Sequence, residues 1–104
     1  MKLHLLYLED NSDDVQLLRF KLSKEWPECD MLVVANEADF LAALKEGKFD
    51  LILADYRIPG FGGLAALAFA REHCPEIPFI FISGVMGEDV AVEALKKEIG
   101  RAHV

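Results

Sequence analysis

The chain has 104 residues, of which 53% are apolar, and this length suits one domain built around one core. Its net charge of -7 disfavours nucleic acid and anionic membranes as direct partners, because their phosphate groups would repel most of the surface. The opening segment MKLHLLYLED is too short and too acidic at its end to be a signal peptide or a membrane span.

Four apolar runs, at residues 3–8, 30–35, 49–54 and 77–82, predict four strands. A helical pattern follows each run. The first helix is capped by Asn11 and stops at Trp26-Pro27, and the second is capped by Asn36 and stops at Gly47. The third covers residues 64–73, and the fourth opens at residues 88–89 and carries apolar positions to residue 99. This alternation predicts an α/β fold, a parallel sheet with helices on both faces.

Chemically active residues stand where three of these strands end. The run at 49–54 ends on Asp55 and a Pro/Gly-rich loop, the run at 3–8 ends on Glu9-Asp10, and the run at 77–82 ends on Ser83. Because parallel strands bring their carboxyl ends to one edge of the sheet, these side chains should converge. Gathered carboxylates repel unless a cation joins them, and hard oxygen ligands suit Mg²⁺. The pattern predicts a Mg²⁺ site with one carboxylate available to attack a phosphoryl group.

In this order and spacing, the residues resemble the receiver domain of two-component response regulators. The match extends over about residues 3–96 and runs through Glu9-Asp10, Asp55, Pro59-Gly60, Gly63, Ser83-Gly84 and Gly87-Glu88. The resemblance implies a flavodoxin-like doubly wound sheet of strand order 2-1-3-4-5. It also implies a cytoplasmic protein that receives a phosphoryl group from a histidine kinase or phosphotransfer protein in a phosphorelay, and that is not itself an enzyme.

The resemblance assigns a role to each residue of the expected site. Asp55 would be the phosphoacceptor, and Ser83 would donate a hydrogen bond to the phosphate. Asp10 would bind Mg²⁺ directly together with Asp55, the backbone carbonyl of Arg57 would complete the metal site, and Glu9 would act through water.

The family's fifth strand and fifth helix have no counterpart among these 104 residues, and no Lys-Pro pair is present. We therefore expect residues 1–104 to be a single, C-terminally truncated receiver domain of strand order 2-1-3-4. Phosphorylation should be impaired without the lysine that would pair with the phosphate. The fourth strand should become an exposed edge, so we expect a homo-oligomer that forms through this strand or by exchange of the fourth helix.

Two other functions compete with this one. A phosphorylation-independent, receiver-like interaction or dimerisation module would keep the fold without using Asp55 as an acceptor. An aspartyl-phosphate phosphohydrolase of the haloacid dehalogenase kind would need an acid two residues after its nucleophile, and Arg57 occupies that position. Taken singly, Asp55 could also be a helix-loop cap and Glu9-Asp10 the solvated end of a strand.

Overall fold

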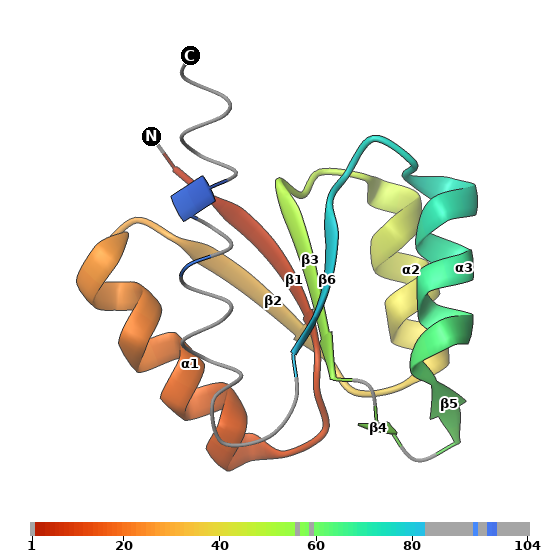
Figure 1. The fold of residues 1–104 in the computed structure, drawn as a ribbon, viewed down its shortest axis with the longest axis horizontal. Helices are drawn as coiled ribbons and strands as arrows, with labels where there is room; N and C mark the ends of the chain where they lie inside the picture. The colour runs from red at the N-terminus through yellow and green to blue at the C-terminus, as the bar shows by residue number, and fades with distance from the viewer. Residues whose placement is uncertain (1, 56, 59, 83–92, 94–95, 98–104) are drawn as a thin grey trace.

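A four-stranded parallel sheet forms the centre of the computed structural model, which describes residues 2–55, 57–58, 60–82, 93 and 96–97 (Figure 1). Its strands are β1 (His4–Leu8), β2 (Asp30–Val34), β3 (Leu51–Asp55) and β6 (Phe79–Ile82). They stand in the order β2-β1-β3-β6, and every neighbouring pair is parallel. Since β6 is the predicted fourth strand, the flavodoxin-like order 2-1-3-4 is confirmed for the described residues.

Three helices connect the strands: α1 (Ser12–Glu25), α2 (Glu37–Glu46) and α3 (Gly63–His73). The predicted caps are present. Asn36 accepts a hydrogen bond from the backbone N–H of Asp39 at 2.9 Å and so begins α2, and Gly47 ends that helix in the left-handed conformation with φ of 63°. Sequence signals therefore placed both ends of α2 within a residue.

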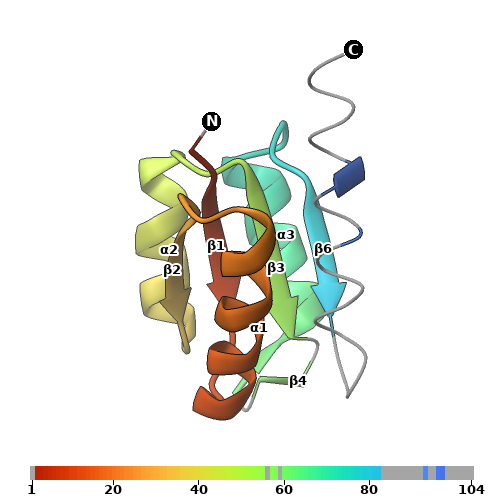
Figure 2. The same ribbon diagram turned by 90° about the vertical axis from the view of Figure 1, so that its left-hand side faces the viewer.

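The helices form a layer on each face of the sheet: α1 covers one face, and α2 and α3 cover the other (Figures 1 and 2). Along the two central strands, β1 and β3, successive side chains pack alternately against the helices on one face and the helix on the other. Leu6 and Ile52 pack with α2 and α3, whereas Leu5 and Leu53 pack with α1. Both faces are buried, which is why these strands read as continuous apolar runs rather than as an alternating pattern.

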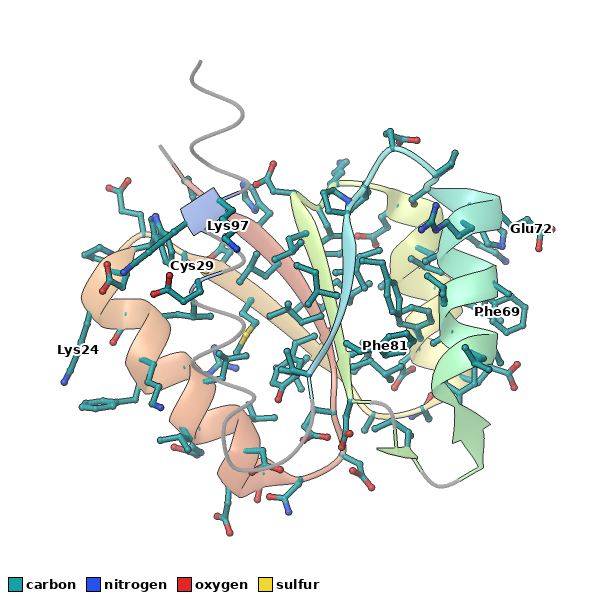
Figure 3. The ribbon with its side chains drawn as sticks, viewed as in Figure 1. Lys24, Cys29, Phe69, Glu72, Phe81 and Lys97 are labelled. Carbon is teal, nitrogen blue, oxygen red and sulfur yellow. The ribbon has the colours of Figure 1, made fainter. Side chains whose placement is uncertain are left out.

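Outer strands and linkers complete both cores. Phe81 projects from β6 toward α2 and α3, whereas Cys29 lies on the α1 side of the sheet (Figure 3). The strands predicted at residues 49–54 and 77–82 begin later than expected, at Leu51 in β3 and Phe79 in β6, and Phe49 and Ile77 pack against the core from the segments before these strands. Apolar character alone did not distinguish strand from packed linker at these points.

The segment after Asp55 was predicted to be a loop, and the structure shows a small hairpin there. Strand β4 (Arg57–Ile58) pairs antiparallel with β5 (Phe61–Gly62), and Gly60 takes φ of 76° at the turn between them. The predicted fourth helix falls mostly outside the described residues. Among the helices that the structure does describe, none is long and apolar enough to cross a bilayer.

Candidate functional site

Three carboxyl groups meet at the carboxyl edge of the sheet. One oxygen from each of Glu9, Asp10 and Asp55 can be chosen so that all three atoms lie within 4.8 Å of one another. Glu9 and Asp10 directly follow β1, and Asp55 is the last residue of β3. The predicted convergence is therefore confirmed for these three acids, whereas that of Ser83 is untested.

Strand register brings Glu9 beside Asp55. In the parallel pairing of β1 with β3, Leu8 lies opposite Ala54, so the next residue on each strand is an acid. On the other side, the backbone N–H of Glu9 donates to the carbonyl of Val34 at 2.9 Å, which extends the contact with β2 by one residue. Glu9 is thus held between two neighbouring strands, and its side chain has little freedom to leave the site.

The turn into α1 fixes the position of Asp10. Its backbone N–H donates to Oε2 of Glu9 at 3.2 Å. The next residue, Asn11, caps α1 by accepting hydrogen bonds from the N–H groups of Asp13 and Asp14 at 2.9 and 3.2 Å. Because the strand, the two acids and the helix cap follow one another without a spacer, the start of α1 determines where Asp10 lies.

Glu9 carries the distinctive electrostatics of the site. It is only 4% exposed, and it is the one charged side chain that is buried among the described residues. The pKa of Glu9 is raised from 4.5 to about 8, chiefly by burial, and also by a hydrogen bond to Asp55 and by the negative charges of Asp55 and Asp14. Without a cation, this site therefore holds a proton at neutral pH.

The donor set fits a hard divalent cation. Carboxylate oxygens are preferred ligands of Mg²⁺, and a cation among them would supply the positive charge that the proton on Glu9 otherwise provides. An oxygen of Glu9 belongs to the same 4.8 Å group as those of Asp10 and Asp55, and its action through water stays a prediction.

The hairpin offers a fourth oxygen. In a hairpin closed by two residues, the pair beside the turn exchanges hydrogen bonds and the next pair does not. Ile58 and Phe61 flank the turn, and Arg57 lies opposite Gly62 in the next pair. By this rule the Arg57 carbonyl oxygen is not used in the pairing of β4 with β5, and its role as a metal ligand stays a prediction.

Two predicted site residues are only partly covered. Ser83 lies outside the described residues, and Arg57 is described by its backbone alone. Asp14, in the first turn of α1, was not predicted as a site residue, yet it helps to raise the pKa of Glu9. The position of Asp14 was a usable signal, because side chains in the first turn of a helix point back toward its N-terminus, which here lies at the site.

The fold and the acidic cluster are those of a signalling receiver, and comparison with known families agrees. Residues 5–101 match the family model of the response regulator receiver domain, and the chain belongs to this family. Members of the family act in two-component signalling, where an aspartate generally accepts the phosphoryl group.

Several curated proteins contain a similar segment. Regulatory protein LuxO of Vibrio cholerae is 29% identical over 89 residues, which cover 86% of this chain and 19% of LuxO. Transcriptional regulatory protein ZraR of Salmonella typhimurium is 30% identical over 95 residues, covering 91% of this chain and 21% of ZraR. Transcription factor SKN7 of Saccharomyces cerevisiae is 30% identical over 88 residues, covering 84% of this chain and 14% of SKN7. The chain thus spans about a fifth or less of the length of these relatives.

Solved structures share the fold. The receiver domain of the hybrid histidine kinase CckA matches with a TM-score of 0.75 and 24% identity, over 91% of this chain and 97% of that one. The receiver domain of the sensor histidine kinase PA1611 from Pseudomonas aeruginosa matches with a TM-score of 0.70 and 22% identity, over 83% of this chain and 70% of that one. That structure was determined with a magnesium ion coordinated in its active-site cleft.

Proposed function

We propose that Asp55 is the phosphoacceptor of this receiver domain. The observation that carries the proposal is the cluster of Glu9, Asp10 and Asp55 oxygens within 4.8 Å at the carboxyl edge of a flavodoxin-like sheet. Asp55 is the partly exposed member that ends a central strand, whereas Glu9 is buried beneath it. An incoming phosphoryl group therefore meets Asp55 rather than Glu9.

Within the proposal, Mg²⁺ is held by Asp10, Asp55 and the backbone carbonyl of Arg57, with Glu9 acting through water or directly. The bound ion would supply positive charge beside the phosphoryl oxygens. Asp10 and Asp55 come from different strands, so the folded sheet supplies the spacing of these ligands. Ser83 is the proposed donor of a hydrogen bond to the phosphate.

The proposed reaction transfers a phosphoryl group from a histidine nitrogen to a carboxylate oxygen of Asp55. A carboxylate oxygen of Asp55 attacks the phosphorus of a phosphohistidine, a P–O bond forms, and the P–N bond breaks. The electron pair of the broken bond returns to the imidazole nitrogen, and the ring leaves as neutral imidazole because its other nitrogen already carries a proton. The products are an acyl phosphate on Asp55 and an unmodified histidine on the donor.

The proposed donor is a histidine kinase or phosphotransfer protein, and the proposed compartment is the cytoplasm. We propose that the chain acts as an acceptor and not as an enzyme with its own turnover. Arg57 supports this view, because an aspartyl-phosphate phosphohydrolase needs an acid at that position and arginine cannot serve as one.

Incubation with Mg²⁺ and acetyl phosphate tests the proposal. The chain should gain the mass of one phosphoryl group, and the adduct should be labile to base. Asp55→Asn should abolish the adduct. Asp50→Asn is the matched control, because Asp50 precedes the same strand at its opposite end, where it accepts a hydrogen bond from the backbone N–H of His4 at 2.9 Å.

The outcomes separate the competing functions. An adduct in Asp50→Asn but not in Asp55→Asn supports the proposal. No adduct on the wild-type chain, with Mg²⁺ binding intact and partner binding unchanged by Asp55→Asn, would favour the phosphorylation-independent interaction module. Catalytic turnover of a small phosphate ester would instead favour the phosphohydrolase.

We also propose that the chain forms a homo-oligomer through β6 or through exchange of the fourth helix. Among the described residues β6 pairs only with β3, and its residues Phe79 to Phe81 are partly rather than fully buried. An edge strand with apolar side chains favours pairing with another chain. Light scattering at micromolar concentration should give at least the dimer mass, and a well-folded monomer would contradict this proposal.

A further inference from the structure

Two apolar side chains anchor the hairpin after Asp55 to the core on one face of the sheet. Ile58 and Phe61, which face each other across β4 and β5, are each 5% exposed and belong to the core beneath α2 and α3. At the turn, Gly60 is exposed, and a Cβ built there would meet no atom within 4 Å. Among the described residues of the hairpin, the contacts that position it therefore come from its apolar side chains and not from Gly60.

Phe61 makes the most extensive of these contacts. Its ring centroid lies 5.7 Å from that of Phe40 on α2, with the ring planes tilted by 59°. On the other side it lies 6.0 Å from the ring of Phe69 on α3, a residue that is labelled in Figure 3. Separations in this range are those of interacting aromatic pairs. Phe61 thus joins the hairpin to both helices of one layer.

An isolated pair of two-residue strands has almost no stability of its own. The backbone of residues 57–58 can hold a defined position only if something outside the hairpin fixes it. In this chain the three phenylalanine rings provide that support, because Phe40 is fully buried and α2 is packed on the sheet. The position of the Arg57 carbonyl then depends on a side chain that never touches the acidic cluster.

We propose that Phe61 is a positioning residue for the metal site. Packed between Phe40 and Phe69, it holds the hairpin so that the Arg57 carbonyl oxygen faces the cluster of Asp10 and Asp55. The inference rests on the proposed function, since it presumes that this cluster binds Mg²⁺. It adds that α2 and α3 contribute to metal affinity, although none of their residues belongs to the cluster.

Mg²⁺ affinity measured by titration calorimetry tests the inference on the whole chain. Phe61→Ala should weaken Mg²⁺ binding by about tenfold or more, as supporting residues of metal sites typically do. Phe61→Leu and Phe69→Leu, which keep an apolar side chain but lose the ring contacts, should weaken binding less and should remain folded. The leucine variants keep the test decisive if Phe61→Ala does not fold.

Leu22→Ala is the matched control. Leu22 is 2% exposed and packs in the core on the α1 side, so this variant also loses a large buried side chain but leaves the hairpin untouched. It should bind Mg²⁺ like the wild-type chain. A second readout is the ¹³C resonance of the Arg57 carbonyl, which should shift on addition of Mg²⁺ to the wild type and shift less in Phe61→Leu.

Each result bears on one claim. Weaker binding in the Phe61 variants together with normal binding in Leu22→Ala supports the positioning role. Two results would overturn the positioning role and leave the proposed function unaffected. One is equal Mg²⁺ affinity in the wild type and in folded Phe61 variants. The other is a loss of Mg²⁺ affinity in Leu22→Ala as large as that in the Phe61 variants. If the wild-type chain binds no Mg²⁺, the proposed metal site fails, and the positioning role fails with it.

Discussion

The buried carboxyl group of Glu9 forms a hydrogen bond with Asp55 across the pairing of β1 with β3. Two carboxyl groups can share such a bond only while one of them carries a proton. Burial of Glu9, which is the larger cause, and this shared bond together raise its pKa to about 8 against an ordinary 4.5. The pairing makes the stability of the metal-free chain depend on pH.

Between about pH 4.5 and 8, the folded chain keeps a proton on Glu9 that the unfolded chain has released. Raising the pH therefore favours the unfolded state, and the contribution of Glu9 to stability is lost as the pH rises through this window. The free energy of unfolding, measured with urea in the presence of a chelator, should fall by at most about 1.4 kcal/mol per pH unit. In Glu9→Gln this slope should disappear, because glutamine does not titrate, and an unchanged slope would refute the assignment to Glu9.

Mg²⁺ should stabilise the fold. At about 100 times its Kd the ion should add about 2.7 kcal/mol to the free energy of unfolding, provided that it binds only the folded chain. The gain should grow with pH, since the ion and the proton on Glu9 compete. Asp10→Asn should lose most of the gain, whereas Asp13→Asn, which removes an exposed acid three residues away, should keep it. Equal gains in both variants would place the ion elsewhere.

The two asparagine caps allow a comparison of stability with site geometry. Asn11→Ala and Asn36→Ala each remove a side chain that accepts hydrogen bonds at the start of a helix, and each should cost about 1 kcal/mol of unfolding free energy in urea. Only Asn11 follows directly on Asp10. Asn11→Ala should therefore also weaken Mg²⁺ binding, and a comparable weakening in Asn36→Ala would show that the effect is general loss of stability.

Adjacent leucines on α1 test which face of this helix meets the sheet. Leu18 is fully buried, whereas Leu17 is 42% exposed. Leu18→Ala should lower the free energy of unfolding by about 2–5 kcal/mol, because it leaves a cavity against β1 and β3. Leu17→Ala should change it by less than about 0.5 kcal/mol. Similar losses in the two variants, measured by thermal or urea unfolding, would contradict this orientation of α1.

Much of the sheet could be predicted from local signals. Continuous apolar runs marked the strands, Asn11 and Asn36 marked helix starts, and Gly47 marked a helix end, because each signal acts within a few residues of the feature it specifies. The meeting of Glu9 and Asp10 with Asp55 followed from one topological rule about parallel strands. These predictions required no knowledge of how distant side chains pack.

Other features depended on packing between distant segments and could not be read from the sequence. In the hairpin formed by β4 and β5, the side chains of Ile58 and Phe61 are buried in the core beneath α2 and α3, and this burial stabilises the hairpin. The sequence indicated only that Glu9 lies at the end of a strand. Its burial accompanies contacts with Val34 and Asp55, which lie on two other strands. The roles of Ser83 and of the predicted fourth helix stay predictions.

The central place of β1 has a consequence for the order of events as the chain folds. This strand is made first, yet it lies between β2 and β3, and its acids remain without Asp55 until β3 has docked beside it. Such non-local, parallel pairings form slowly compared with local turns. The acidic cluster would therefore bind a cation only after β1 and β3 have paired. In a refolding experiment, the time at which Mg²⁺ binding first appears would report when β3 docks beside β1.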